Sequence, residues 1–267
     1  MRAALITEYR KLVTTRLWWI LLIAMALYMA FLAAVMAWTL TQGNEMSTAE
    51  GGVALTAGEL TRVVYTLAPS LGYVFPLIVG ALAMTNEFRH QTITPTLLAE
   101  PRRTVVLGAK LVSTGVFGLV FGLVGTLATV GVGAGVLAAL GEQTYLTDPD
   151  VLRTLALSVV ALAVWAVVGV GFGTLLTNQV AAIVVLLAFT QFVEPVLRVV
   201  FGFVSWAKGI APYLPGAAGE AMVGSSFYSA GGISELLAPW QGFLVLVAYA
   251  LVFAAIGRAT TLRRDIT

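Results

Sequence analysis

Six long runs of apolar residues divide this chain, and each is close to the length of a membrane-crossing helix, which needs about 20 mostly apolar residues. The third run is long for one span, so we expect that helix to tilt or to project beyond the bilayer. The pattern predicts an all-α integral membrane protein. The six predicted transmembrane helices are Leu17–Leu40, Val63–Thr85, Leu111–Leu140, Thr154–Thr177, Val180–Val200 and Trp240–Gly257.

The composition agrees with a membrane protein. Charged residues make up 10% of the chain and the mean hydropathy is +0.94, whereas a soluble domain carries about 25% charged residues. No shift in composition marks a second domain, so residues 1–267 are expected to form a single transmembrane domain. The net charge of +2 gives no indication of nucleic-acid binding, and the absence of cysteine excludes disulfides.

The positions of the positive charges predict the orientation of the chain, because Lys and Arg gather in cytoplasmic loops. With the N-terminus in the cytoplasm, eleven of the 15 Lys and Arg residues fall on the cytoplasmic side. An even number of spans then puts the C-terminus in the cytoplasm as well. The four basic residues that remain outside are Arg62, Arg153, Arg198 and Lys208.

The segment before the first span, residues 1–16, has the pattern of an amphipathic helix. Leu5, Tyr9, Leu12 and Val13 share one face, so this helix is expected to lie in the plane of the cytoplasmic headgroups. The alternative is an ordinary basic anchor for the first span. A cleaved signal peptide is not expected, because the first apolar run is much longer than the roughly 7–15 residues of the hydrophobic region of a signal peptide.

Two spans contain residues that suggest a transport pathway. Pro69 and Pro76 interrupt the second span, and each removes a backbone hydrogen bond and kinks the helix. In the fifth span Glu194 and Arg198 stand four residues apart, on one helix face, where they could neutralise each other. Ionisable residues at membrane depth suggest function, although a static kink and a pair in the outer headgroups are the structural alternatives.

Glycine is frequent in the third and fourth spans, and Gly118 and Gly122 form a GxxxG pair. Small residues let membrane helices approach closely, either within one subunit or between subunits. Between the fifth and sixth spans, residues 201–239 mix apolar residues with Pro and Gly. This segment predicts re-entrant helices at the outer side, with an outer amphipathic cap as the alternative.

No pattern for catalysis or metal binding is present. His90 is the only histidine, which excludes a His-rich zinc site. Glu142, Asp148 and Asp150 are expected to form a solvated turn. No G-x-x-x-x-G-K-[ST] phosphate loop occurs, so the chain is not expected to be an enzyme or to bind a cofactor itself.

The most polar stretch, residues 86–103, lies between the second and third spans and also carries apolar residues. Pro95 and Pro101 bound a predicted short helix from Pro95 to Glu100, because proline is tolerated in a first helical turn. Thr94 is the expected cap. Leu97 and Leu98 would then be exposed, as expected of a helix that contacts another protein at the cytoplasmic face.

This stretch resembles the cytoplasmic signature of type-2 ATP-binding-cassette permeases, the ABC-2 class. That signature contains E-x-R, often a glycine, then T-[IL], L-L, P and R, followed by a lysine at the start of the next span. Gln91 stands where the glycine is frequent, and Lys110 is the lysine. The matching residues are Glu87, Arg89, Thr92, Ile93, Leu97, Leu98, Pro101 and Arg103.

The resemblance implies an exporter subunit in a bacterial inner membrane. Two six-span subunits, identical or different, would pair, and each would dock a nucleotide-binding ATPase that binds the ATP and Mg²⁺. Residues 86–103 would be the coupling segment, with Glu87, Arg89, Thr92, Leu97, Leu98, Pro101 and Arg103 carried over to coupling. The few charges in the spans favour a hydrophobic or amphiphilic cargo such as a drug, an antibiotic or a lipid-like compound.

Two other functions remain open at this point. A membrane scaffold would recruit a cytoplasmic partner through the same segment without moving cargo. An ion-coupled secondary transporter would need carboxylates near the membrane midplane, for which Glu194 is the candidate.

Overall fold

The computed structural model describes residues 2–49, 55–204, 206–226, 229 and 235–261, and the described part of the chain is helical without a strand. Six helical stretches are long and apolar enough to cross a membrane, which confirms the predicted multi-pass, all-α class. Four of the six are single helices. The single helices are α2 (Leu17–Ala49), α6 (Arg103–Ala139), α7 (Pro149–Gly173) and, last in the chain, α12 (Pro239–Thr260).

The other two membrane-length stretches are interrupted by π-helical turns. The second stretch consists of α3 (Ala57–Tyr65), the π-helical segment η1 (Ala68–Gly72) and α4 (Val74–Arg89). The fifth consists of α8 (Gln179–Ala188), the π-helical segment η2 (Phe189–Val193) and α9 (Glu194–Phe203). Single π-helical turns in α-helices frequently occur at functional sites.

Pro69 and Pro76 both lie at the interruption of the second stretch. Pro69 is in η1, and Pro76 is in the first turn of α4, where a missing backbone N–H is best tolerated. The predicted break in the second span is therefore present, and it takes the form of a π-helical segment between two α-helices.

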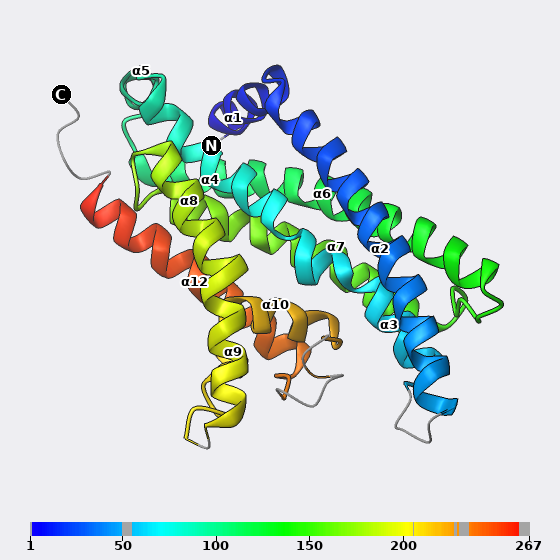
Figure 1. Ribbon diagram of the computed structural model, residues 1–267. Helices are drawn as coiled ribbons and strands as arrows, with labels where there is room; N and C mark the ends of the chain where they lie inside the picture. The colour runs from blue at the N-terminus through cyan, green and yellow to red at the C-terminus, as the bar shows by residue number, and fades with distance from the viewer. Residues whose placement is uncertain (1, 50–54, 205, 227–228, 230–234, 262–267) are drawn as a thin grey trace.

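Four shorter helices complete the described structure: α1 (Arg2–Thr14), α5 (Ile93–Ala99), the 3₁₀ turn η3 (Ala211–Tyr213) and α10 (Pro215–Val223). Figure 1 shows α1 and α5 at the end of the bundle where the N-terminus lies, and α3, α9 and α10 toward the opposite end. We call these the α1 end and the α10 end.

The centre of the bundle is formed by the second and fourth membrane-length stretches. About two thirds of the second stretch (67%) and of the fourth (61%) is buried inside the chain, against 22% of α2 and of the fifth stretch. Helix α7 packs against α4, α6, α10 and α12. The outer helices keep exposed apolar side chains that suit contact with lipid tails, among them Leu27, Phe31, Leu123, Leu127, Val184 and Leu251.

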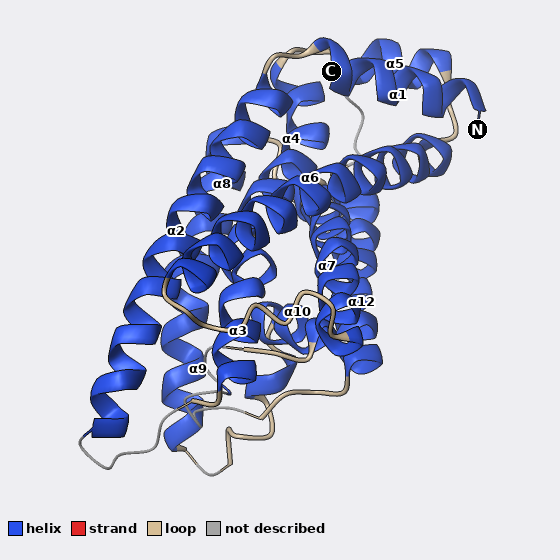
Figure 2. Cartoon of the chain, turned by 90° about the vertical axis from the view of Figure 1, so that its right-hand side faces the viewer, coloured by secondary structure: helices blue, strands red, loops and turns tan. Residues whose placement is uncertain are grey.

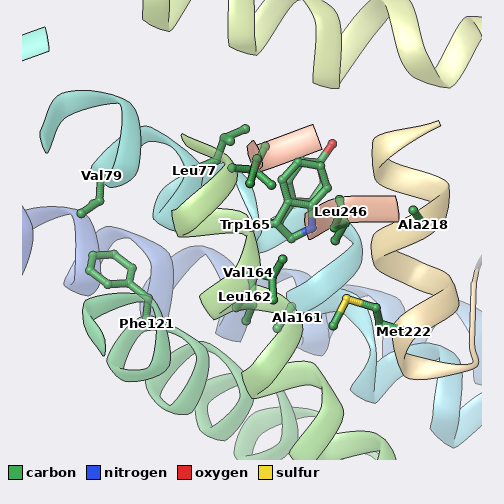
Figure 3. Packing of buried hydrophobic residues seen from close by; sticks show 14 of the residues in the cluster. Leu77, Val79, Phe121, Ala161, Leu162, Val164, Trp165, Ala218, Met222 and Leu246 are labelled. Atoms are coloured by element: carbon green, nitrogen blue, oxygen red, sulfur yellow. The ribbon is translucent and has the colours of Figure 1, made fainter. Parts of the chain in front are cut away.

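Trp165 of α7 lies in the middle of the largest apolar cluster, with Leu77 of α4, Phe121 of α6 and Leu246 of α12 around it (Figure 3). Its ring stacks on Tyr73, with 4.3 Å between the ring centroids. The cluster also includes Ala218 and Met222 of α10 (Figure 3). All nine residues of α10 are buried, so this part of the 201–239 segment lies inside the bundle.

Glycines bring α4 and α7 into backbone contact. A Cβ atom added to Gly80 would lie 2.0 Å from the carbonyl oxygen of Ala166, and one added to Gly169 would lie 2.1 Å from that of Leu77. No side chain fits at such distances, so only glycine permits this approach.

The GxxxG pair of the third span also packs within the chain. Gly118 of α6 meets Ala163 of α7, and Gly122 meets Val159. The structure therefore supports packing inside the subunit for this pair.

The close approach of α4 and α7 predicts a loss of stability for Gly169→Ala. The added methyl group must separate two backbones, and such overpacking costs about 1–3 kcal/mol. Thermal unfolding in detergent, followed by the fluorescence of the six tryptophans, should show a lower midpoint. Gly131→Ala on α6 is the control, because nothing lies within 4 Å of its added Cβ. Equal losses in both variants would contradict the proposed close contact.

Candidate functional site

The polar stretch begins where α4 ends in a Schellman motif. Gln91 has a φ of +54°, the N–H of Thr92 donates to the carbonyl of Glu87 at 2.9 Å, and the N–H of Gln91 donates to that of Phe88 at 3.2 Å. The left-handed position of this motif normally holds glycine. The same motif ends α6, with Gly141 at a φ of +84°.

Glu87, in the last turn of α4, is at the centre of a buried ion cluster with Glu8, Lys11 and Lys110. Its Oε1 atom lies 2.5 Å from the Lys11 Nζ and 2.7 Å from the Lys110 Nζ. Lys110 Nζ also lies 2.6 Å from Glu8 Oε2, and Lys11 Nζ lies 3.0 Å from Glu8 Oε1. The cluster joins α1, α4 and α6 through two carboxylates and two ammonium groups.

The other oxygen of Glu87 holds α5 in place. Glu87 Oε2 accepts hydrogen bonds from the hydroxyl groups of Thr92 at 2.9 Å and Thr96 at 3.0 Å. Lys11 Nζ donates to Thr96 Oγ1 at 3.0 Å. One carboxylate therefore connects α5 to the helix before it, to the helix after it and to α1.

Because this cluster is buried, its stability depends on the balance between its positive and negative charges. Lys110 is 1% exposed and Glu87 is 3% exposed. A carboxylate at the C-terminal end of a helix is disfavoured by the helix dipole, and a buried charge without a partner is costly. Glu87 is stable in this position because two cations lie within hydrogen-bond distance of it.

Lys11 stays charged in the cluster. Burial lowers the pKa of its ammonium group, but the hydrogen bond to Glu87 and the charges of Glu8 and Glu87 outweigh this effect, so the pKa lies above its usual 10.5. Lys11 therefore contributes to stability below pH 10.5, and this contribution is lost as the pH rises through the raised pKa.

The structure divides the predicted coupling residues into buried and exposed groups. Arg89 is exposed and donates to Gln179 Oε1 of α8 at 2.8 Å. Leu98 is 78% exposed. Leu97 is half-buried against Met84 and Ile93, so the expectation that both leucines are exposed is wrong for Leu97.

The bounds of the short helix also differ from the prediction. Helix α5 runs from Ile93 to Ala99, two residues earlier than expected at its start, and Thr92 is at the cap position in place of Thr94. Pro95 is in the first turn of α5, and Pro101 lies in the link to α6. Arg103 begins α6 and is half-buried.

Sequence reasoning missed Glu8, Lys11 and Thr96 as members of this site. The expected apolar face of residues 1–16 does not include Glu8, yet Glu8 is the buried residue of α1. Tyr9 and Val13 of the expected apolar face remain exposed. One available signal was Lys110, because a lysine deep within an apolar helix requires an acidic partner.

A second group of buried charges lies near the α10 end. Arg198 of α9 pairs with both carboxylate oxygens of Glu220 on α10, and the hydroxyl of Ser226 also donates to Glu220. Glu194 Oε1 accepts the backbone N–H groups of Gly216 at 2.5 Å and Ala217 at 3.2 Å. Glu220 was absent from the sequence interpretation, which considered only Glu194 as a partner for Arg198.

These charges border a cavity of about 360 Å³ between the second and fifth stretches and α10. Residues of both π-helical segments lie on its wall, and the Tyr73 hydroxyl donates across to the carbonyl of Thr190 at 3.2 Å. The pathway candidates Glu194 and Arg198 thus share a cavity. Pro69 lies in η1 beside it, and Pro76 is one turn further along α4.

A scan against models of known protein families gives no match, and a search of curated protein sequences gives none either.

The ion cluster predicts a large effect for Lys110→Met. Removing this ammonium leaves Glu8 and Glu87 short of one positive charge in a buried site, and breaking such a pair costs about 3–5 kcal/mol. Thermal unfolding should shift down, and amide hydrogen exchange should rise across Arg2–Thr14 and Ile93–Ala99.

Two control variants test the role of charge balance. Lys110→Met combined with Glu87→Gln leaves Glu8 and Lys11 as a neutral pair, so it should regain part of the lost stability. Arg102→Met removes a cation that is 72% exposed and pairs with Glu100, and it should leave unfolding unchanged. Unchanged exchange in α1 and α5 of the Lys110→Met protein would refute the role of the cluster.

Proposed function

We propose that this chain is the permease subunit of an ATP-binding-cassette exporter of the ABC-2 class. The observation that carries the proposal is the attachment of α5, which is held to α1, α4 and α6 by one buried carboxylate while Leu98 faces solvent. A short helix fixed in this way transmits a push from a soluble partner to the membrane helices.

The surface around α5 suits a protein partner. Helices α1 and α5 lie side by side at one end of the bundle (Figure 2). A cavity of about 380 Å³ lies between them, with Thr7 and Lys11 on one side and Pro95 and Ala99 on the other. An exposed leucine beside a hollow of this kind is an arrangement that protein interfaces use for anchoring. The partner in this proposal is a nucleotide-binding ATPase, which binds ATP and Mg²⁺ and drives the cycle.

The remaining parts of the proposal follow from the membrane setting. The bias of positive charge supports a cytoplasmic α1 end and cytoplasmic termini in a bacterial inner membrane. A second permease subunit, identical or different, completes the transporter. Within the described part of residues 201–239, α10 contributes a re-entrant helix at the outer side. The exposed apolar residues Tyr9 and Val13 support an α1 that rests in the headgroup layer.

Leu98→Asp is the direct test of docking. The tagged chain is purified in mild detergent from its native host, and the nucleotide-binding ATPase that co-purifies with it is quantified. The variant should recover at least about tenfold less ATPase, equivalent to about 1.4 kcal/mol of binding free energy, because a charge replaces an apolar contact.

Met46→Asp is the matched control for this experiment. Met46 is 65% exposed and lies in the last turn of α2. That end of α2 is far from α5 (Figure 1), so the variant should retain the ATPase and its hydrolysis of ATP. Equal retention of the ATPase by Leu98→Asp and the parent chain would remove α5 from the interface. Retention of a partner without any ATP-dependent transport would favour the scaffold function.

A further inference from the structure

One oxygen of Glu194 is buried without a hydrogen-bond partner in the described part of the chain. Glu194 is 1% exposed, and its Oε1 atom accepts two backbone N–H groups of α10, whereas its Oε2 atom accepts none. Buried polar atoms in proteins nearly always have a partner. An unpartnered carboxylate oxygen on the wall of a cavity is in position to receive a ligand.

The charge around the cavity indicates the sign of that ligand. Arg198 is the basic residue among the described residues that line the cavity, and Glu220 binds its guanidinium through both oxygens. Two carboxylates thus face one guanidinium, so Glu194, Arg198 and Glu220 together carry a formal charge of −1. A monovalent cation at Glu194 Oε2 would neutralise it, and the energy of a buried charge makes that neutralisation favourable.

The walls of the cavity favour an organic cation. Met36, Leu67 and Leu71 supply apolar surface, and Tyr73 supplies an aromatic ring that attracts a cation over its face. The volume of about 360 Å³ lies within the range of small-molecule sites. The described residues hold no group of three or more acidic or histidine side chains that would suit a metal ion.

We propose that this cavity binds a monovalent amphiphilic cation with Glu194 as its counter-ion. The inference rests on the proposed function in one respect, since it makes this class of cation the cargo of the exporter. The binding itself requires only the permease chain.

The test uses two probes of the same shape and opposite charge. Tetraphenylphosphonium and tetraphenylborate are titrated into the purified permease, without ATPase, in phosphatidylcholine nanodiscs, and empty nanodiscs supply the background. The cation should bind saturably and the anion should not. Glu194→Gln keeps the acceptor for Gly216 and Ala217 but removes the charge, so it should weaken cation binding at least about tenfold.

Two further variants keep the result interpretable. Ser70→Leu fills the cavity from η1 with Glu194 intact and should also weaken cation binding, which guards against misfolding of the Glu194 variant. Asp150→Asn removes an exposed carboxylate and should leave binding unchanged. Absent cation binding, equal binding by Glu194→Gln, or equal binding of tetraphenylborate would each overturn the inference.

The outcome is separable from the test of the proposed function. Cation binding that depends on Glu194, together with failure to recover an ATPase, would retain the site and reject the exporter. Recovery of the ATPase through α5 without cation binding would retain the exporter and reject this cargo.

Discussion

The contact between Glu87 and Lys110 supports the arrangement of the whole α1 end. Both side chains are almost fully buried, and each is stable there because it has partners of opposite charge, Lys11 and Lys110 for Glu87, and Glu8 and Glu87 for Lys110. Glu87 then has an oxygen left for the hydroxyl groups of Thr92 and Thr96, and Lys110 has hydrogens left for Glu8. Helix α5 also packs Ile93 and Leu97 against Met84 and Phe88 of α4, and α1 places Tyr9 against Phe117 of α6. The polar network and these apolar contacts together hold the two helices in place.

Buried charges are arranged differently at the α10 end. There the charges also lie inside the bundle, but the carboxylate and guanidinium groups are unequal in number and a cavity borders them. A cluster with equal numbers of positive and negative charges holds its helices together rigidly. A cluster with unequal numbers beside a cavity leaves room for a charged ligand. The two buried groups therefore suit different tasks, although both consist of acidic and basic side chains on neighbouring helices.

Hydrophobic patterning was enough to predict the six membrane-length helices, because a bilayer imposes one length and one polarity on each of them. Pro95 and Pro101 also indicated a short helix, from Pro95 to Glu100, within residues 86–103. The start of α5 was missed because Thr92 is fixed by Glu87 through a side-chain contact that no local pattern reveals. Arg198 was given Glu194 as its partner because spacing along one helix is visible in a sequence, whereas Glu220 approaches from a separate helix.

Gln91 has a backbone conformation that glycine adopts more readily. Its φ of +54° places it in the left-handed region, where glycine is least strained, and ABC-2 permeases often have glycine at the matching position. The turn is needed because α5 must leave α4 at once for Thr92 and Thr96 to reach Glu87. The resemblance at residues 86–103 thus corresponds to a local structure with a stated cause.

Helix α4 connects the ion cluster at the α1 end with the cavity near the α10 end, so a movement of this helix would affect both. It runs from beside Tyr73, on the cavity wall, to Glu87 in the ion cluster, about 21 Å at 1.5 Å per residue. Its centre packs backbone to backbone against α7. In the exporter proposed above, a push on α5 would therefore meet a rigid helix held by glycine contacts. The break at η1 is where that motion has room to change the wall of the cavity, because a π-helical turn interrupts the regular hydrogen bonds there.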